Sequence, residues 1–141
     1  MSSATPEALF DLLSSAPEWP GWFRPVRRVE WIGPVPGTVR RVTIGMVHVA
    51  EEILEEQRPV HHAYSIRSVI PVRDHRADVW FHPTARGTEI AWTTRLSPRV
   101  RGTGRPLIAG LRMGVTQLAR ALIRAAEREQ DPSNSRDGAE I

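Results

Sequence analysis

The chain has 141 residues, 40% of them hydrophobic and 25% charged, values typical of one globular domain with its own core. It contains no cysteine, which excludes disulfides, thiolate catalysis and thiolate metal ligands. The formal net charge is only +3, and its 19 basic residues are all arginines scattered among 16 acidic residues, so no nucleic-acid partner is expected.

The first predicted element is a short helix. Thr5 is a suitable N-cap, Pro6 is tolerated in the first turn, and Glu7 suits the positive end of the helix dipole. An apolar stripe of Leu9, Phe10, Leu12 and Leu13 follows. The next segment, 18–23, carries three aromatic residues among prolines and is expected to form a packed corner.

From Arg27 the pattern changes to the period of two that indicates β-strands. Strands are expected at 27–31, after the turn 33–37 from Thr38 to Glu56, and at 60–70, 77–82 and 88–96. Alternation places His62, Tyr64 and Ile66 on one face of their strand. In the last strand, Thr88, Ile90, Trp92 and Thr94 share a face.

The final predicted element is a long helix from about Pro106 to Glu129. Its apolar residues recur at spacings of three and four: Leu107, Leu111, Val115, Leu118 and Leu122. Residues 130–141 are polar and aperiodic, and a disordered tail is expected there. The predicted domain therefore spans residues 1–129.

A run of strands followed by one long helix predicts an α+β fold with the helix packed on one face of an antiparallel sheet. The helix needs an apolar partner surface, and the aromatic face of the sheet is the one available. A curved sheet around a single helix leaves room between the two, where small ligands usually bind.

The sequence also resembles a known family. The residues that carry the resemblance are Ala4–Phe10 opening a helix, Trp19-Pro20-Gly21-Trp22 in the corner, Gly37-Thr38-Val39-Arg40, the strand around Tyr64, Gly87–Trp92 and the last helix. In order and spacing they are similar to the polyketide cyclase/dehydrase-like branch of the START-like (SRPBCC, Bet v 1-like) superfamily. The resemblance implies a helix-grip fold of about six strands with a hydrophobic pocket.

Members of that family usually carry a further strand before the first helix. Here only Met1-Ser2-Ser3 precede the helix, so the first strand is expected to be short or missing. An unpaired sheet edge would follow, and it favours a homodimer. Trp80 lies opposite to Val79 and Phe81 along its strand, so an outer-face position is expected, which also suits an interface.

The leading functional hypothesis is binding of a hydrophobic or aromatic small molecule, polyketide- or lipid-like. Strand parity and helix period predict nine ligand-binding residues: Tyr64, Ile66, Phe81, Ile90, Trp92, Thr94, Leu111, Val115 and Leu118. Trp22, from the corner, is a further ligand-binding candidate, expected to cap the mouth of the pocket. Simple core packing is the alternative for each of them. A protein–protein interaction module without a small ligand is a further alternative.

An aromatase/cyclase-type enzyme is the other candidate function. It would polarise a ketone and move a proton, with His62 and Tyr64 as catalytic candidates, helped by Glu51 or an inward arginine such as Arg41 or Arg67. Against this, His61 and His62 follow the Arg58-Pro59 turn, where an exposed strand end is expected.

Other chemistry is not favoured by the spacing of the side chains. The five histidines do not form a ligand pair at i, i+2 or helical spacing, so neither metal nor cofactor is expected. Glu51, Glu52, Glu55 and Glu56 suit a solvated edge strand better than a pair of hydrolytic carboxylates. No signal peptide or membrane span is apparent, so a cytoplasmic location is expected.

Overall fold

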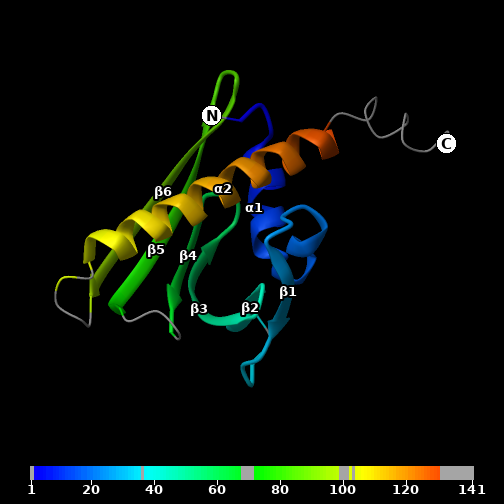
Figure 1. Cartoon of the computed structure of the whole chain (residues 1–141). Helices are drawn as coiled ribbons and strands as arrows, with labels where there is room; N and C mark the ends of the chain where they lie inside the picture. The colour runs from blue at the N-terminus through cyan, green and yellow to red at the C-terminus, as the bar shows by residue number, and fades with distance from the viewer. Residues whose placement is uncertain (1, 36, 68–71, 99–101, 103, 131–141) are drawn as a thin grey trace.

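The computed structural model describes residues 2–35, 37–67, 72–98, 102 and 104–130. The elements, in chain order, are α1 (Pro6–Ser14), the 3-10 helix η1 (Ala16–Gly21), β1 (Val26–Trp31), β2 (Val39–Ile44), β3 (Val47–Gln57), β4 (His61–Ile66), β5 (Val72–Thr84), β6 (Gly87–Pro98) and α2 (Gly104–Gln130). The predicted α+β helix-grip fold is confirmed, since a curved antiparallel sheet lies beneath the long helix α2 (Figure 1).

The six strands form one antiparallel sheet in the order β1-β2-β3-β4-β5-β6. The prediction of one extended run from Thr38 to Glu56 was wrong. Gly45, with a φ of 61°, and Met46 form the turn that separates β2 from β3. β-Branched residues on both sides of this turn hide it in the sequence. The split makes β3 an internal strand.

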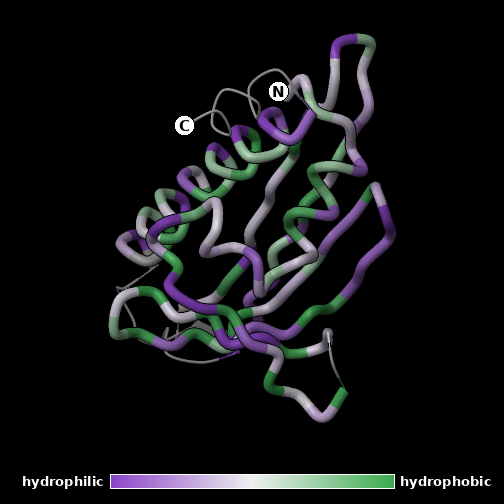
Figure 2. The backbone as a smooth tube through the Cα atoms, turned by 90° about the vertical axis from the view of Figure 1, so that its right-hand side faces the viewer, coloured by the Kyte–Doolittle hydropathy of each residue, from purple (hydrophilic) through white to green (hydrophobic). Residues whose placement is uncertain are grey.

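The core lies between the sheet, α1, η1 and the C-terminal half of α2. Leu9, Leu13 and Phe81 are completely buried, and Leu122 on α2 joins them. α1 begins as predicted, because the Thr5 side chain accepts a hydrogen bond from the Ala8 amide. Along α2, hydrophobic and hydrophilic residues alternate within each turn (Figure 2), so one apolar stripe faces the molecule.

The N-terminal segment contacts both β6 and α2. Ser2 forms an antiparallel bridge with Thr88, and the Ser2 hydroxyl donates a hydrogen bond to Glu127 on α2. Gly87 permits this approach, since a Cβ atom there would lie 2.0 Å from the Ser2 carbonyl oxygen. The first strand was predicted to be short or missing. Among the described residues, this single bridge lies where that strand would pair with β6.

α2 extends slightly beyond the predicted helix at both ends, and Gln130 donates a side-chain hydrogen bond to Thr5. Residues 131–141, where a disordered tail is expected, lie outside the described residues, so the boundary of the domain stays a prediction. Within the described part of the chain, no helix combines the length and the apolar character needed to cross a bilayer.

Candidate ligand-binding site

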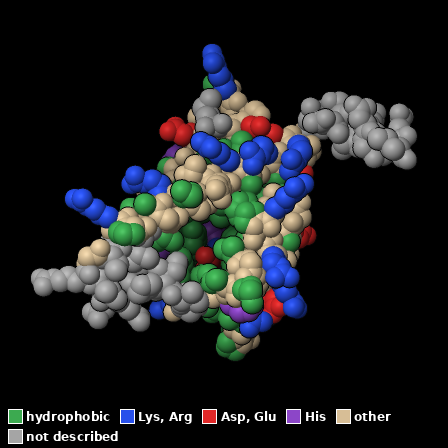
Figure 3. Space-filling view, viewed as in Figure 1, with side chains coloured by type: hydrophobic (Ala, Val, Ile, Leu, Met, Phe, Trp, Pro, Cys, Tyr) green, Lys and Arg blue, Asp and Glu red, His purple; other side chains and the backbone are tan. Residues whose placement is uncertain are grey.

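A groove of about 440 Å³ opens between β6 and α2. Ile90, Trp92, Thr94 and Leu96 line it from the strand, and Ile108, Leu111, Arg112, Val115, Thr116, Ala119, Arg120 and Ile123 line it from the helix. Figure 3 shows the molecule hollowed beneath α2, with hydrophobic side chains around the hollow and acidic and histidine atoms in its depth. None of the residues that line the groove between β6 and α2 is acidic or a histidine.

The groove exists because α2 packs closely along only half of its length. In the C-terminal half, Ala121, Leu122, Ala125 and Ala126 are buried. In the N-terminal half, Leu111 and Val115 remain half-buried, and Ile108 is 45% exposed. Large apolar side chains that a core would normally cover therefore face open space.

Polar side chains lie on the inner face of the sheet. Arg40 on β2 is completely buried, and its Nε donates a 2.7 Å hydrogen bond to Oε1 of Glu51 on β3. The guanidinium carbon lies 4.5 Å from the ring centroid of Trp19 and 5.2 Å from that of Tyr64. Cation–π contact with both rings holds the cation in place.

His62 and Tyr64 are neighbours on the inner face of β4, with ring centroids 6.0 Å apart. Both are buried. Burial lowers the pKa of His62, although Glu56, whose Oε1 lies 3.2 Å from Nδ1, opposes the shift. Burial and the nearby Glu51 carboxylate raise the pKa of Tyr64. At neutral pH the pair is therefore a neutral imidazole beside a protonated phenol.

Several buried donors in the interior make no well-aligned hydrogen bond to another described residue. They include Nη1 and Nη2 of Arg40 and the indole N–H groups of Trp92 and Trp22. The Trp92 N–H also interacts with the Tyr64 hydroxyl, which opposes the rise in the pKa of Tyr64. Buried polar groups almost always have partners, so such a concentration is unusual. Of these residues, Trp92 also lines the groove between β6 and α2.

The predicted ligand-binding residues divide into three groups. Ile90, Trp92, Thr94, Leu111 and Val115 line the β6–α2 groove. Tyr64 and Phe81 are buried in the core, while Ile66 and Leu118 are half-buried. Trp22 lies elsewhere, in a second groove between α2 and the segment 21–25. Ligand contact stays a prediction for all of them.

The inward arginine was assigned to the wrong residues. Arg41 points outward and pairs with Glu30, and the 56% exposed side chain of Arg67 pairs with Glu52. Arg40, which was not among the predicted residues, is the buried one. Arg40 and Val42 are two positions apart in β2 and therefore lie on the same, buried face of the strand. This period of two is the signal that would have identified Arg40.

Two expectations of exposure were also wrong. His61 and His62 are 2% and 0% exposed, because β4 lies between β3 and β5 rather than at a solvated end. The glutamates do not mark an edge strand, since β3 is internal. Glu51 faces inward, whereas Glu55 lies on the outer face of the sheet beside His61.

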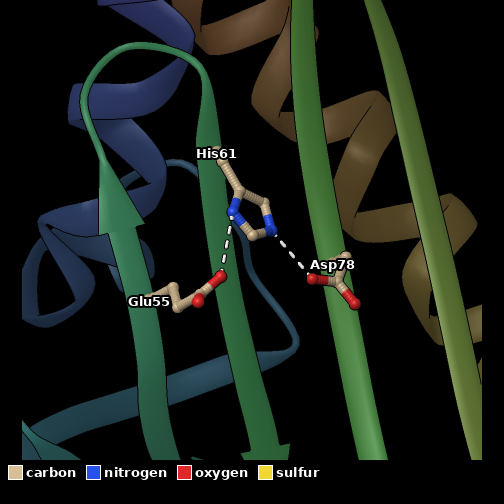
Figure 4. Close-up of side chains that lie close together, drawn as sticks. All are labelled: Glu55, His61 and Asp78. Carbon is tan, nitrogen blue, oxygen red and sulfur yellow. Dashed lines mark hydrogen bonds and ion pairs between the residues drawn. The ribbon is translucent and has the colours of Figure 1, made fainter.

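The outer face carries the arrangement in Figure 4. His61 Nε2 lies 2.8 Å from Asp78 and Nδ1 lies 3.3 Å from Glu55. Glu55, His61 and Asp78 each offer one atom that could bind a metal ion, and these three atoms lie within 4.8 Å of one another. However, Arg76 bonds both carboxylates and provides the positive charge that a metal ion would supply. Trp80 lies outside as predicted, stacked on His61 at 3.8 Å.

Residues 1–128 match the family model described as "Polyketide cyclase / dehydrase and lipid transport", and the chain belongs to this family. The resemblance seen in the sequence is thereby confirmed. No protein of curated function matches the sequence significantly.

Solved structures with the same fold cover most of the chain. XoxI from Bacillus cereus is 16% identical over 92% of this chain and 93% of its own, with a TM-score of 0.77. The Zhui aromatase/cyclase from Streptomyces sp. R1128 is 16% identical over 94% and 92%, with a TM-score of 0.75. A START superfamily protein from Mycobacterium smegmatis is 12% identical over 90% and 92%, with a TM-score of 0.66.

Proposed function

We propose that the protein binds a hydrophobic or aromatic small molecule in the groove between β6 and α2. The observation that carries the proposal is the half-buried apolar stripe of α2 facing Ile90 and Trp92 across about 440 Å³ of open space. That volume lies within the range of small-molecule sites. An occupant would remove apolar surface from water on both walls, at roughly 25 cal/mol per Å².

The polar groups favour a ligand that also carries oxygen atoms. The indole N–H of Trp92 is buried, makes no well-aligned hydrogen bond to another described residue although it lies close to the Tyr64 hydroxyl, and offers a donor at the groove wall. A carbonyl or hydroxyl oxygen would satisfy it, at a gain of about 1 kcal/mol. An oxygenated ring system, polyketide-like, therefore suits the site better than a plain hydrocarbon chain.

Tryptophan fluorescence tests the proposal. Titration with oxygenated polyaromatic compounds, fatty acids and sterols should give saturable quenching by one class. Trp92→Phe should remove most of the signal, whereas Trp80→Phe, on the outer face, should retain it. Calorimetry gives the affinity independently of the reporter. Absence of saturable binding by every class would refute the proposal and favour an interaction module instead.

A second candidate function is an aromatase/cyclase reaction, and the adjacency of His62 and Tyr64 supports it. A neutral imidazole accepts a proton from a carbon next to a ketone, while a phenol donates a hydrogen bond to the developing enolate oxygen. Conversion of a linear poly-β-ketone to an aromatic ring, followed by absorbance, tests this. Both His62→Gln and Tyr64→Phe should abolish conversion; unchanged rates in either would eliminate the pair as catalysts.

A further inference from the structure

A second groove, of about 600 Å³, lies on another face of α2, against the segment 21–25. Four arginines line it: Arg24 from that segment, and Arg120, Arg124 and Arg128 from α2. We call it the arginine groove. No acidic residue is among those lining it, which are otherwise Gly21, Trp22, Phe23, Pro25, Gln117 and Ala121.

The positive charge in this groove is not neutralised by the fold. Within the described part of the chain, none of the four arginines has an ion pair or a side-chain hydrogen bond. Without these four residues, the formal net charge of the chain would change from +3 to −1. Basic side chains gather over the C-terminal half of α2 in Figure 3.

This arrangement does not stabilise the protein by itself. Arg120, Arg124 and Arg128 are spaced by four residues, so each faces the next across one helical turn, and like charges at that spacing destabilise a helix. Arg128 alone stands in the last turn, where a positive charge interacts favourably with the helix dipole. A function for the group is therefore the better explanation.

We propose that the arginine groove binds a ligand carrying phosphate groups. One guanidinium neutralises a carboxylate. A phosphate ester has a charge of about −1.5 to −2 and three acceptor oxygens, so it can bind several arginines at once. The three helix arginines extend over about 12 Å, enough for more than one phosphate. Trp22 adds an indole N–H that is buried and has no partner among the described residues.

The test uses charge-removing variants and pyrophosphate as the probe, measured by calorimetry. Arg124→Gln/Arg128→Gln removes two groove arginines. Arg86→Gln/Arg105→Gln is the matched control, because both arginines are exposed, without an ion pair to another described residue, and outside the groove. We expect saturable binding that the groove variant weakens on the order of tenfold or more. The control should bind like the unchanged protein.

A parallel experiment identifies the source of the phosphate. Co-sedimentation with phosphatidylcholine vesicles, with and without phosphatidic acid, shows whether the group must belong to a lipid. Binding to the acidic vesicles alone, lost in the groove variant, supports a phospholipid headgroup, whereas pyrophosphate binding supports a soluble phosphate compound. Three results would overturn the proposal: neither probe binds, both variants weaken binding equally, or citrate binds as tightly as pyrophosphate.

Discussion

Arg40 and Glu51 face each other across β2 and β3 and join through a 2.7 Å hydrogen bond, with the arginine completely buried. Removal of one member of a buried ion pair leaves an uncompensated charge, at a cost of about 3 kcal/mol or more. Glu51→Gln should therefore lower the free energy of unfolding by about that amount. Urea denaturation measures the change.

The double variant Arg40→Met/Glu51→Leu is the control for this pair. Replacement of both partners by apolar groups removes the uncompensated charge, so the double variant should be more stable than Glu51→Gln. A double variant at least as destabilised as the single one would show that the cation–π contacts of Arg40, rather than its charge pairing, dominate.

A larger side chain in the groove between β6 and α2 should block it. Val115 is half-buried and lines the groove, so Val115→Trp fills space without displacing the core. We expect ligand affinity to fall on the order of tenfold, with little change in the melting temperature. Met113→Trp is the matched control, since Met113 is 65% exposed and does not line the groove. Equal losses in both variants would place the ligand elsewhere.

The buried histidines should make stability depend on pH. Burial lowers the pKa of His62 and of His75 in the folded state, whereas the unfolded chain has histidines with a pKa of about 6.5. As the pH falls below that value, the unfolded state takes up protons first, and the free energy of unfolding decreases. Urea denaturation between about pH 7 and 5.5 should reveal the decrease.

Substitution of these histidines tests the cause. His62→Gln/His75→Gln should flatten the pH dependence, and His48→Gln/His82→Gln, which changes two exposed histidines, is the matched comparison. A slope that survives in the first variant would assign the effect to other groups.

Two glycines in α2 offer a stabilising change. Gly110 and Gly114 are exposed, and a Cβ atom at either position would have no neighbour within 4 Å. Gly110→Ala and Gly114→Ala should each raise the free energy of unfolding by about 0.5–1 kcal/mol. Gly102→Ala should instead destabilise the protein, because Gly102 has a φ of 87°. Thermal unfolding compares the three; loss of stability in both helix variants would contradict the expectation.

The fold was predictable because its strongest signals are periodic. The alternation in β6 and the three-and-four spacing in α2 determine which faces are apolar, and both were read correctly. The interior of the sheet was not predictable in the same way. A shift of one residue in the register of a strand moves every side chain to the opposite face of the sheet. The register of β2 therefore decides whether Arg40 or its neighbour Arg41 faces inward.

The candidate site was predicted in part for a related reason. Strand parity and helix period located five of the groove-lining residues, Ile90, Trp92, Thr94, Leu111 and Val115, because β6 and α2 are the periodic elements, but they did not select the other residues that line the groove. Burial of His61 and His62 depends on which strands flank β4. The sequence of one strand does not show which strands pair with it. The arginine groove joins side chains about a hundred residues apart, and the sequence shows only half of it, as a four-residue spacing in α2.

The link between Ser2 and Glu127 joins residues that are 125 positions apart. During synthesis, Ser2 leaves the ribosome well before its partner on α2, because all six strands lie between them in the chain. The strands can pair before then, but the apolar stripe of α2 cannot yet cover them. Until α2 has emerged, the nascent sheet exposes its concave face, and a chaperone that shields apolar surface would bind most usefully in that interval.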